Sequence, residues 1–246
     1  MNIGIIGGTG AGDLFETGTP TAIKSPFGPP SAKPEPVAFG DRQAWFLPRH
    51  GRPHRIAPHM VNYRANVFCL KTLGVDGILA INAVGGINPS HEPGDLVLPD
   101  DLIDYTWGRE HTFTDAGTAE LRHVEFERPF DGRLRLAVLE AAAAAGQTVH
   151  DGGVYGATQG PRLETGAEIR RLARDGCDLV GMTAMPEAGL AREAGLEYVS
   201  ICVVANRAAG LEAEPVSVDE IHRVMEASMA RVVAVARATL EVLAGG

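Results

Sequence analysis

Two short polar segments near the start of the chain carry groups that could hold an anion. Residues 7–10 (Gly-Gly-Thr-Gly) follow an apolar run, so their backbone N–H groups and the Thr9 hydroxyl could bind phosphate oxygens. Residues 49–54 (Arg-His-Gly-Arg-Pro-His) set Arg49 beside His50, and a planar guanidinium is well suited to a bidentate oxyanion contact. Taken alone, the first segment also fits a plain strand-to-turn connection and the second a solvated basic loop.

Several other kinds of site are poorly supported by these segments. The dinucleotide fingerprint G-x-G-x-x-G fails because Asp13 stands where the third glycine is needed, and no P-loop lysine follows. A metal site would need several converging ligands, and His50 and His54 would share a face only on a helix. The chain has no G-x-S-x-G or H-E-x-x-H motif and no setting for a cysteine nucleophile, so covalent catalysis is not indicated.

Three later segments also bring polar side chains to the ends of expected elements. Residues 158–165 form a turn that delivers Glu164 ahead of a helix, and Pro186 suits the first position of another helix, which places Thr183 near an N-terminus that favours anions. A buried strand ends at Asn206, whose amide can both donate and accept hydrogen bonds. Ligands of open α/β sheets gather at such strand ends.

The order of apolar runs predicts the elements that must position these groups. Strands that alternate with helices predict one α/β domain over residues 1–246, with a mixed sheet flanked by helices. Thr165 with Glu168, and Ser217 with Glu220, have capping-box spacing at two helix starts. Strands are expected at residues 2–6, 44–47, 77–84, 95–98, 153–155, 179–181 and 198–204, helices at 61–73, 133–145, 167–173, 186–194 and 218–243, and a proline-rich surface loop at 24–36.

Composition limits the partners and the location. The formal net charge of -9 repels nucleic acids and anionic lipids, so we expect no nucleic-acid or membrane partner and local capture of any anionic ligand. The three cysteines are far apart and odd in number, which indicates reduced core residues. No signal peptide or membrane-spanning run is recognisable, so we expect a cytoplasmic protein.

These segments, in this order, resemble the nucleoside phosphorylase family, specifically its methylthioadenosine phosphorylase and trimeric purine nucleoside phosphorylase branch. The resemblance runs over nearly the whole chain and implies the fold of that family, in which the mixed sheet is partly barrel-like. It implies phosphorolysis with inorganic phosphate as a co-substrate and with no cofactor or metal. The matching segments are residues 7–10, 49–54, 58, 61–66, 82–86, 160–165, 181–187 and 190–195.

The resemblance also implies roles for single residues. The phosphate site would consist of Thr9, Arg49, His50, Asn82, the backbone of Ala83, and Thr183. The nucleoside site would consist of Met182 at the sugar, Leu163 (commonly Phe in relatives), Glu164 and Asn206 at the base, and Val218 and Ile221 at the 5′ substituent. Arg49, His50 and Asn206 are the expected catalytic residues. His123 matches a histidine that the family donates to the neighbouring subunit's site, which implies a homotrimer.

Departures from the methylthioadenosine branch at three positions predict the substrate. That branch has aspartates at the positions of Asn206 and Ala208 and a serine at the position of Glu164. An amide can donate to the O6 of a 6-oxopurine, and a carboxylate can accept its N1–H. Apolar Val218 and Ile221 suit a methylthio group better than a hydroxyl, which they would leave unpaired. We therefore expect methylthioinosine as the substrate, with inosine or guanosine and methylthioadenosine as alternatives.

Overall fold

Ten strands of one sheet form the centre of the structure, a computed structural model that describes residues 1–8, 11, 15–40, 42–114, 121 and 123–245. The strands are β1 (Ile3–Gly7), β2 (Glu35–Phe39), β3 (Arg42–Pro48), β4 (Gly77–Gly86), β5 (Leu96–Leu98), β6 (Asp101–Asp104), β7 (Val149–Asp151), β8 (Val154–Ala157), β9 (Leu179–Gly181) and β10 (Glu197–Arg207). The helices are the 3-10 helix η1 (Pro58–Met60) and the α-helices α1 (Tyr63–Thr72), α2 (Arg133–Ala144), α3 (Gly166–Arg174), α4 (Ala184–Glu193) and α5 (Val218–Gly245).

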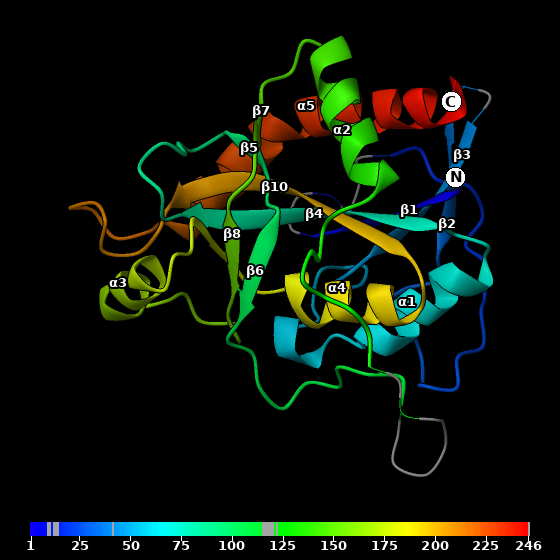
Figure 1. Cartoon of the computed structure of the whole chain (residues 1–246), viewed down its shortest axis with the longest axis horizontal. Coiled ribbons are helices and arrows are strands. Elements are labelled where there is room, and N and C mark those ends of the chain that lie inside the picture. The colour runs from blue at the N-terminus through cyan, green and yellow to red at the C-terminus, as the bar shows by residue number, and fades with distance from the viewer. Residues whose placement is uncertain (9–10, 12–14, 41, 115–120, 122, 246) are drawn as a thin grey trace.

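Strand β4 is the centre of this sheet. It is parallel to β1 on one side and to β10 on the other, and the main order of strands is β2-β3-β1-β4-β10-β5-β7. The last residues of β4 also pair antiparallel with β9, which continues through β8 to β6, so the sheet branches there. Figure 1 shows β6 and β8 running steeply across the direction of β4, which agrees with the expected mixed and partly barrel-like sheet.

Helices cover the sheet on both faces (Figure 1). Alternate residues of a strand point to opposite faces, and in β4 this divides the apolar run into two cores. Leu79 and Ile81 belong to a core with α2 and α5, whereas Ile78 and Ala80 belong to a core with α1 and α4. Because both faces are buried, β4 is apolar along its whole length, as a central parallel strand requires.

Most expected elements are confirmed, with shifted ends. The capping box at Thr165 is present in full, and at the other site Glu220 N–H donates to the Ser217 hydroxyl at 3.4 Å. Three strands were not predicted: β6 and β7 are short and polar, and β2 begins at Glu35, inside the expected proline-rich loop. None of the described helices is long and apolar enough to cross a membrane.

Candidate active site

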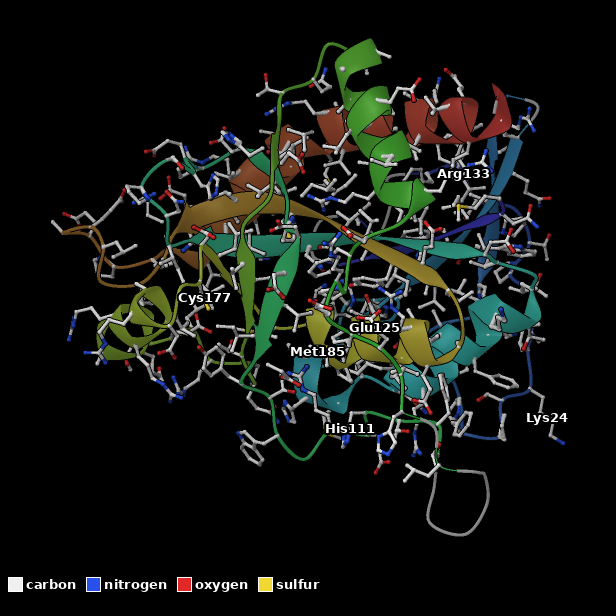
Figure 2. The ribbon with its side chains drawn as sticks, viewed as in Figure 1. Lys24, His111, Glu125, Arg133, Cys177 and Met185 are labelled. Carbon is white, nitrogen blue, oxygen red and sulfur yellow. The ribbon has the colours of Figure 1, made fainter. Side chains whose placement is uncertain are left out.

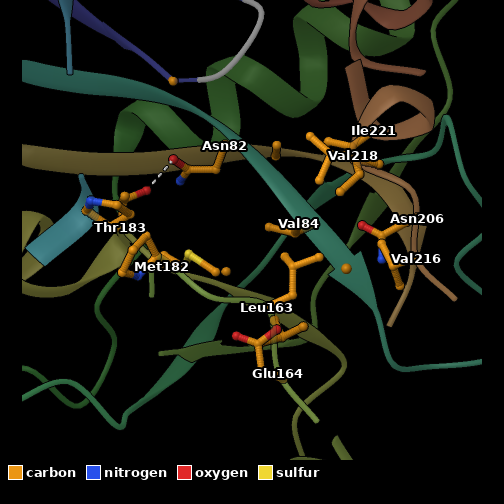
Figure 3. Close-up of a pocket in the computed structure, with 18 of the residues that line it drawn as sticks. Asn82, Val84, Leu163, Glu164, Met182, Thr183, Asn206, Val216, Val218 and Ile221 are labelled. Carbon is orange, nitrogen blue, oxygen red and sulfur yellow. Dashed lines mark hydrogen bonds between the residues drawn. The ribbon is translucent and has the colours of Figure 1, made fainter. Parts of the chain in front are cut away.

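A pocket of about 370 Å³ opens at the carboxyl ends of the parallel strands β1, β3, β4 and β10. Each of these strands, or the residues directly after it, contributes to the wall, as expected for ligand sites of open α/β sheets. The lining residues from these four strands and their ends are Gly8, Arg49, His50, Asn82, Ala83, Val84, Gly85, Ala205 and Asn206. Other lining side chains come from the residues before α3, from the start of α4 and from the start of α5 (Figure 3).

Nearly all residues implied by the resemblance meet in this pocket. They are Arg49, His50, Asn82, Ala83, Leu163, Glu164, Met182, Thr183, Asn206, Val218 and Ile221. Thr9 lies outside the described residues. His123 is exposed, lies between β6 and α2, and does not line the pocket of its own chain, so its role in a neighbouring subunit stays a prediction.

Arg49 is fully buried and its position is fixed by a carboxylate. Its Nε and one terminal nitrogen each donate to Glu187 of α4 at 2.8 Å, and its other terminal nitrogen donates to the Ile81 carbonyl oxygen at 3.2 Å. Burial alone would lower the pKa of Arg49, but Glu187 outweighs it and holds that pKa above its ordinary value. A guanidinium has five N–H groups. These bonds use three of them, so two remain for a ligand. The expected oxyanion fork is therefore occupied by Glu187, and only the two remaining terminal N–H groups can contact an anion.

Gly8 is a glycine because the chain passes very close to this ion pair. A Cβ atom at Gly8 would lie 2.8 Å from a terminal nitrogen of Arg49 and 2.8 Å from the Ile81 carbonyl oxygen. Gly8 therefore permits a close backbone approach, which is one established use of glycine near ligands.

His50 is a neutral imidazole with a defined tautomer. Its Nδ1 lies 2.7 Å from the Ile56 carbonyl oxygen, and because a carbonyl only accepts, Nδ1 carries the proton. Burial, with a smaller contribution from Arg49, lowers the pKa of His50 to about 4. The ring stacks on His54 with centroids 4.5 Å apart and planes 7° apart. Nε2 is therefore the ring atom left to bind a ligand, and it can only accept.

A buried chain of hydrogen bonds completes this end of the pocket. The Thr183 hydroxyl donates to Asn82 Oδ1 at 3.0 Å (Figure 3), and Asn82 Nδ2 donates to the Ser200 hydroxyl at 2.7 Å. Thr183 is the N-cap residue of α4 and uses no side-chain bond for capping, but the backbone leaves the helical conformation at Met185, so the longer part of this helix begins only after that residue. We call the residues Arg49, His50, Asn82 and Thr183 the oxyanion subsite.

The base end of the pocket presents one carboxylate and one amide. The Thr158 hydroxyl donates to Glu164 Oε1 at 2.6 Å, which leaves Oε2 able to accept from a ligand. Asn206 follows a β-bulge in β10, and its Nδ2 donates to the Arg207 carbonyl oxygen at 2.7 Å, so one N–H and Oδ1 remain. Figure 3 shows Leu163 and Glu164 together on one side of the pocket and Asn206 on another.

The third region of the pocket combines apolar and imidazole side chains. Val216, Val218 and Ile221 line it (Figure 3). His54, which the sequence suggested only as a possible metal ligand, and His222, which it did not single out, line it as well. Burial lowers the pKa of His54, and the nearby His222 lowers it further. Within the described residues, no group of three or more His, Cys, Asp or Glu side chains could hold a metal ion.

Glu187, Ser200, His54 and His222 are the site residues that sequence reasoning missed. Glu187 lies 138 positions from its partner Arg49, and no local pattern connects them. The one available signal was its place in the first turn of the helix after Thr183. Ser200 looks like an ordinary residue of an apolar strand, and His222 like one polar residue of an exposed helix start.

Comparisons with known proteins point to one family. A sequence model of the family described as the phosphorylase superfamily matches residues 2–241. The chain is 47% identical over 230 residues to a probable S-methyl-5′-thioinosine phosphorylase of Pseudomonas syringae, covering 93% of this chain and 94% of that relative. It is 40% identical over 230 residues to a 6-oxopurine nucleoside phosphorylase of Pyrococcus furiosus, covering 91% of this chain and 86% of that relative.

Solved structures extend the similarity to the whole fold. A methylthioadenosine phosphorylase from Schistosoma mansoni in complex with adenine superposes with a TM-score of 0.94 at 34% identity, covering 100% of this chain and 93% of that chain. The family match spans nearly the whole sequence, and the relatives are similar in both sequence and fold. The chain therefore belongs to the phosphorylase superfamily.

Proposed function

We propose that this chain cleaves 6-oxopurine nucleosides with inorganic phosphate, and that its preferred substrate is S-methyl-5′-thioinosine, which it converts to hypoxanthine and 5-methylthioribose 1-phosphate. The observation that supports this best is a single pocket with an oxyanion subsite at one end and Glu164 with Asn206 at another. The relatives named as S-methyl-5′-thioinosine and 6-oxopurine nucleoside phosphorylases support the same reaction.

The reaction needs no nucleophile from the protein. Breaking an N-glycosidic bond makes the sugar cation-like while the purine leaves with negative charge, and an enzyme accelerates the step by stabilising both charges. Phosphate held by the oxyanion subsite attacks C1′ of the sugar, and its negative charge stabilises the developing cation. Met182 contributes to the wall between the two ends, where the sugar must lie. Orientation of the two reactants accounts for a large part of the expected rate.

The base end favours a 6-oxopurine because of its hydrogen-bonding pattern. Glu164 Oε2 can accept from the N1–H that a 6-oxopurine carries, whereas adenine would place a lone pair against this carboxylate. The remaining Asn206 N–H can donate to O6, and Oδ1 can accept from a protonated N7 as the base departs. Methylthioadenosine is therefore the less favoured alternative, although the solved relative in complex with adenine is a methylthioadenosine phosphorylase.

Inosine or guanosine is the stronger alternative, because the 5′ end is not uniformly apolar. Val218 and Ile221 suit a methylthio group, but His54 and His222 could pair a 5′-hydroxyl. Methylthioinosine, inosine and methylthioadenosine should be assayed side by side, with and without phosphate. The proposal predicts phosphate-dependent release of hypoxanthine, fastest from methylthioinosine, and slow release of adenine.

The active assembly that we propose is a cytoplasmic homotrimer in which His123 reaches the site of the neighbouring subunit. The exposure of His123 and its absence from its own pocket are compatible with that role. Light scattering should give three times the 26.0 kDa chain mass. His123→Ala should raise the KM for the nucleoside without changing that mass.

A further inference from the structure

We propose that the oxyanion subsite selects phosphate in a form that still carries a proton, whose O–H donates to Nε2 of His50, and that it therefore discriminates against sulfate. This inference rests on the proposed function, because it places the co-substrate phosphate in this subsite. It adds a chemical reason for the choice of anion, and it depends on the directions of the hydrogen bonds around Arg49, His50 and Thr183.

The first observation is the fixed tautomer of His50. The Ile56 carbonyl holds the proton on Nδ1, and the stacked ring of His54 restricts rotation of the imidazole. The ring is neutral near pH 7, since the pKa of His50 is lowered to about 4. Nε2 receives no hydrogen bond from the described residues, and His50 lines the pocket with 7% of its surface exposed. A ligand oxygen without a proton would place its lone pairs against those of Nε2.

The second observation is that the charge of Arg49 is already compensated. Glu187 forms a two-point ion pair with it, both side chains are almost fully buried, and the Tyr198 hydroxyl donates to the same carboxylate at 2.9 Å. Burial keeps Tyr63, Tyr155 and Tyr198 neutral, because it raises the pKa of each phenol. With His50 neutral, the subsite carries no net positive charge. Because monohydrogen phosphate and sulfate carry the same charge, such a subsite must distinguish them by their hydrogen-bonding groups and not by their charge.

The third observation is the direction of the Thr183 hydroxyl bond. Because this hydroxyl donates to Asn82 Oδ1, it presents lone pairs to a ligand and is a second acceptor. Among the described side chains of the oxyanion subsite, the donors that remain are the second N–H of Asn82 Nδ2 and the two free N–H groups of Arg49. Donors and acceptors thus occur together in the subsite. Phosphate near neutral pH offers both kinds of group, whereas sulfate offers acceptors only.

The test compares three tetrahedral anions on the intact protein. Dissociation constants for phosphate and sulfate are measured by calorimetry, and arsenate is tested as a replacement for phosphate in base release. Leaving a buried acceptor unpaired weakens binding by about tenfold to a hundredfold, so sulfate should bind more weakly than phosphate by that factor. Arsenate, which keeps a proton near neutral pH, should support base release.

Two variants and one control variant separate the contribution of the His50 acceptor from that of the Arg49–Glu187 ion pair. His50→Gln replaces the Nε2 acceptor with an amide that can donate, and Glu187→Gln removes the charge that compensates Arg49. His50→Gln should narrow the ratio between the sulfate and phosphate dissociation constants by about tenfold. Glu187→Gln should tighten the binding of both anions and leave this ratio unchanged. His59→Gln changes an exposed histidine that does not line the pocket and should leave the ratio unchanged. Thermal unfolding of each variant shows that it is folded.

The outcomes are distinct. Equal affinity of the wild-type protein for sulfate and phosphate overturns the inference without any variant, so it can be tested even where a variant does not fold. An unchanged ratio of the two dissociation constants in folded His50→Gln also overturns it. If the wild-type protein neither binds phosphate nor releases base with it, the proposed function fails instead.

Discussion

Two side chains of the pocket carry the proposed choice of purine. Glu164 has one oxygen bonded to Thr158 and one free, and Asn206 has one N–H bonded to its own backbone neighbour and one free. Glu164 therefore offers one acceptor to the edge of a base, and Asn206 offers one donor and one acceptor. The sequence predicted both residues, but it could not predict which of their atoms are already bonded, because those bonds depend on the turn before α3 and on the bulge in β10.

Asn206→Asp exchanges the amide donor for a carboxylate. We expect it to lower kcat/KM for methylthioinosine by about 10²–10³, the usual effect of losing a hydrogen bond to developing charge. Methylthioadenosine should be affected less, because its 6-amino group can donate to the new carboxylate. Steady-state assays with both substrates measure the ratio of kcat/KM for methylthioinosine to kcat/KM for methylthioadenosine. Unchanged selectivity would remove Asn206 from the base subsite.

Arg49→Met tests the oxyanion subsite and the buried ion pair together. It should raise the KM for phosphate sharply, and it should also lower the free energy of unfolding by about 3–5 kcal/mol because Glu187 is left as an uncompensated buried charge. Arg49→Met combined with Glu187→Leu should recover much of the stability but none of the phosphate affinity. Recovery of a wild-type phosphate KM in the double variant would show that Arg49 does not bind the anion.

The start of helix α5 lines the part of the pocket where we propose that the 5′ substituent binds. Val218 and Ile221 lie on its first turn and His222 follows directly, so one helix end presents both an apolar and a polar wall. The helix itself was predicted from its periodicity and length. The contribution of His222 was not predicted, because His222 acts together with His54. The loop that carries His54 lies far away in sequence and meets α5 only in the folded chain.

His222→Leu should separate the two classes of 5′ substituent. We expect kcat/KM for inosine to fall by about tenfold through loss of a hydrogen-bond partner, with little loss for methylthioinosine. Arg223→Leu is the matched control, because Arg223 is exposed on the same turn and pairs with Glu220 outside the pocket. A parallel loss for both nucleosides would argue against a role of His222 in 5′ selection.

The molecule consists of one branched sheet with a helix-covered core on each face. Its pocket lies at the carboxyl ends of the central strands. The long apolar strands β4 and β10 and the alternation of elements were predictable from the sequence, because central strands buried on both faces must be apolar. The branch through β9, β8 and β6 was not, since three- and four-residue strands carry too little pattern to reveal their pairing.

The free energy of unfolding should decrease as the pH falls from about 6.5 towards 4. Burial lowers the pKa of His50 to about 4, and it also lowers the pKa of His54 and His91. Between these pH values the unfolded chain binds more protons than the folded chain, which favours unfolding. Denaturant titrations at several pH values measure how steeply the free energy of unfolding changes with pH. His50→Gln should make this dependence weaker. A stability that rises towards pH 4 would contradict the neutral buried imidazole.

The most direct test of the proposed function is the release of free base from methylthioinosine, inosine and methylthioadenosine, measured with and without phosphate. The structure of the pocket predicts that hypoxanthine release depends on phosphate, that methylthioinosine has the highest kcat/KM, and that adenine release is slow. Release of hypoxanthine at the same rate without phosphate, or a preference for methylthioadenosine, would contradict it.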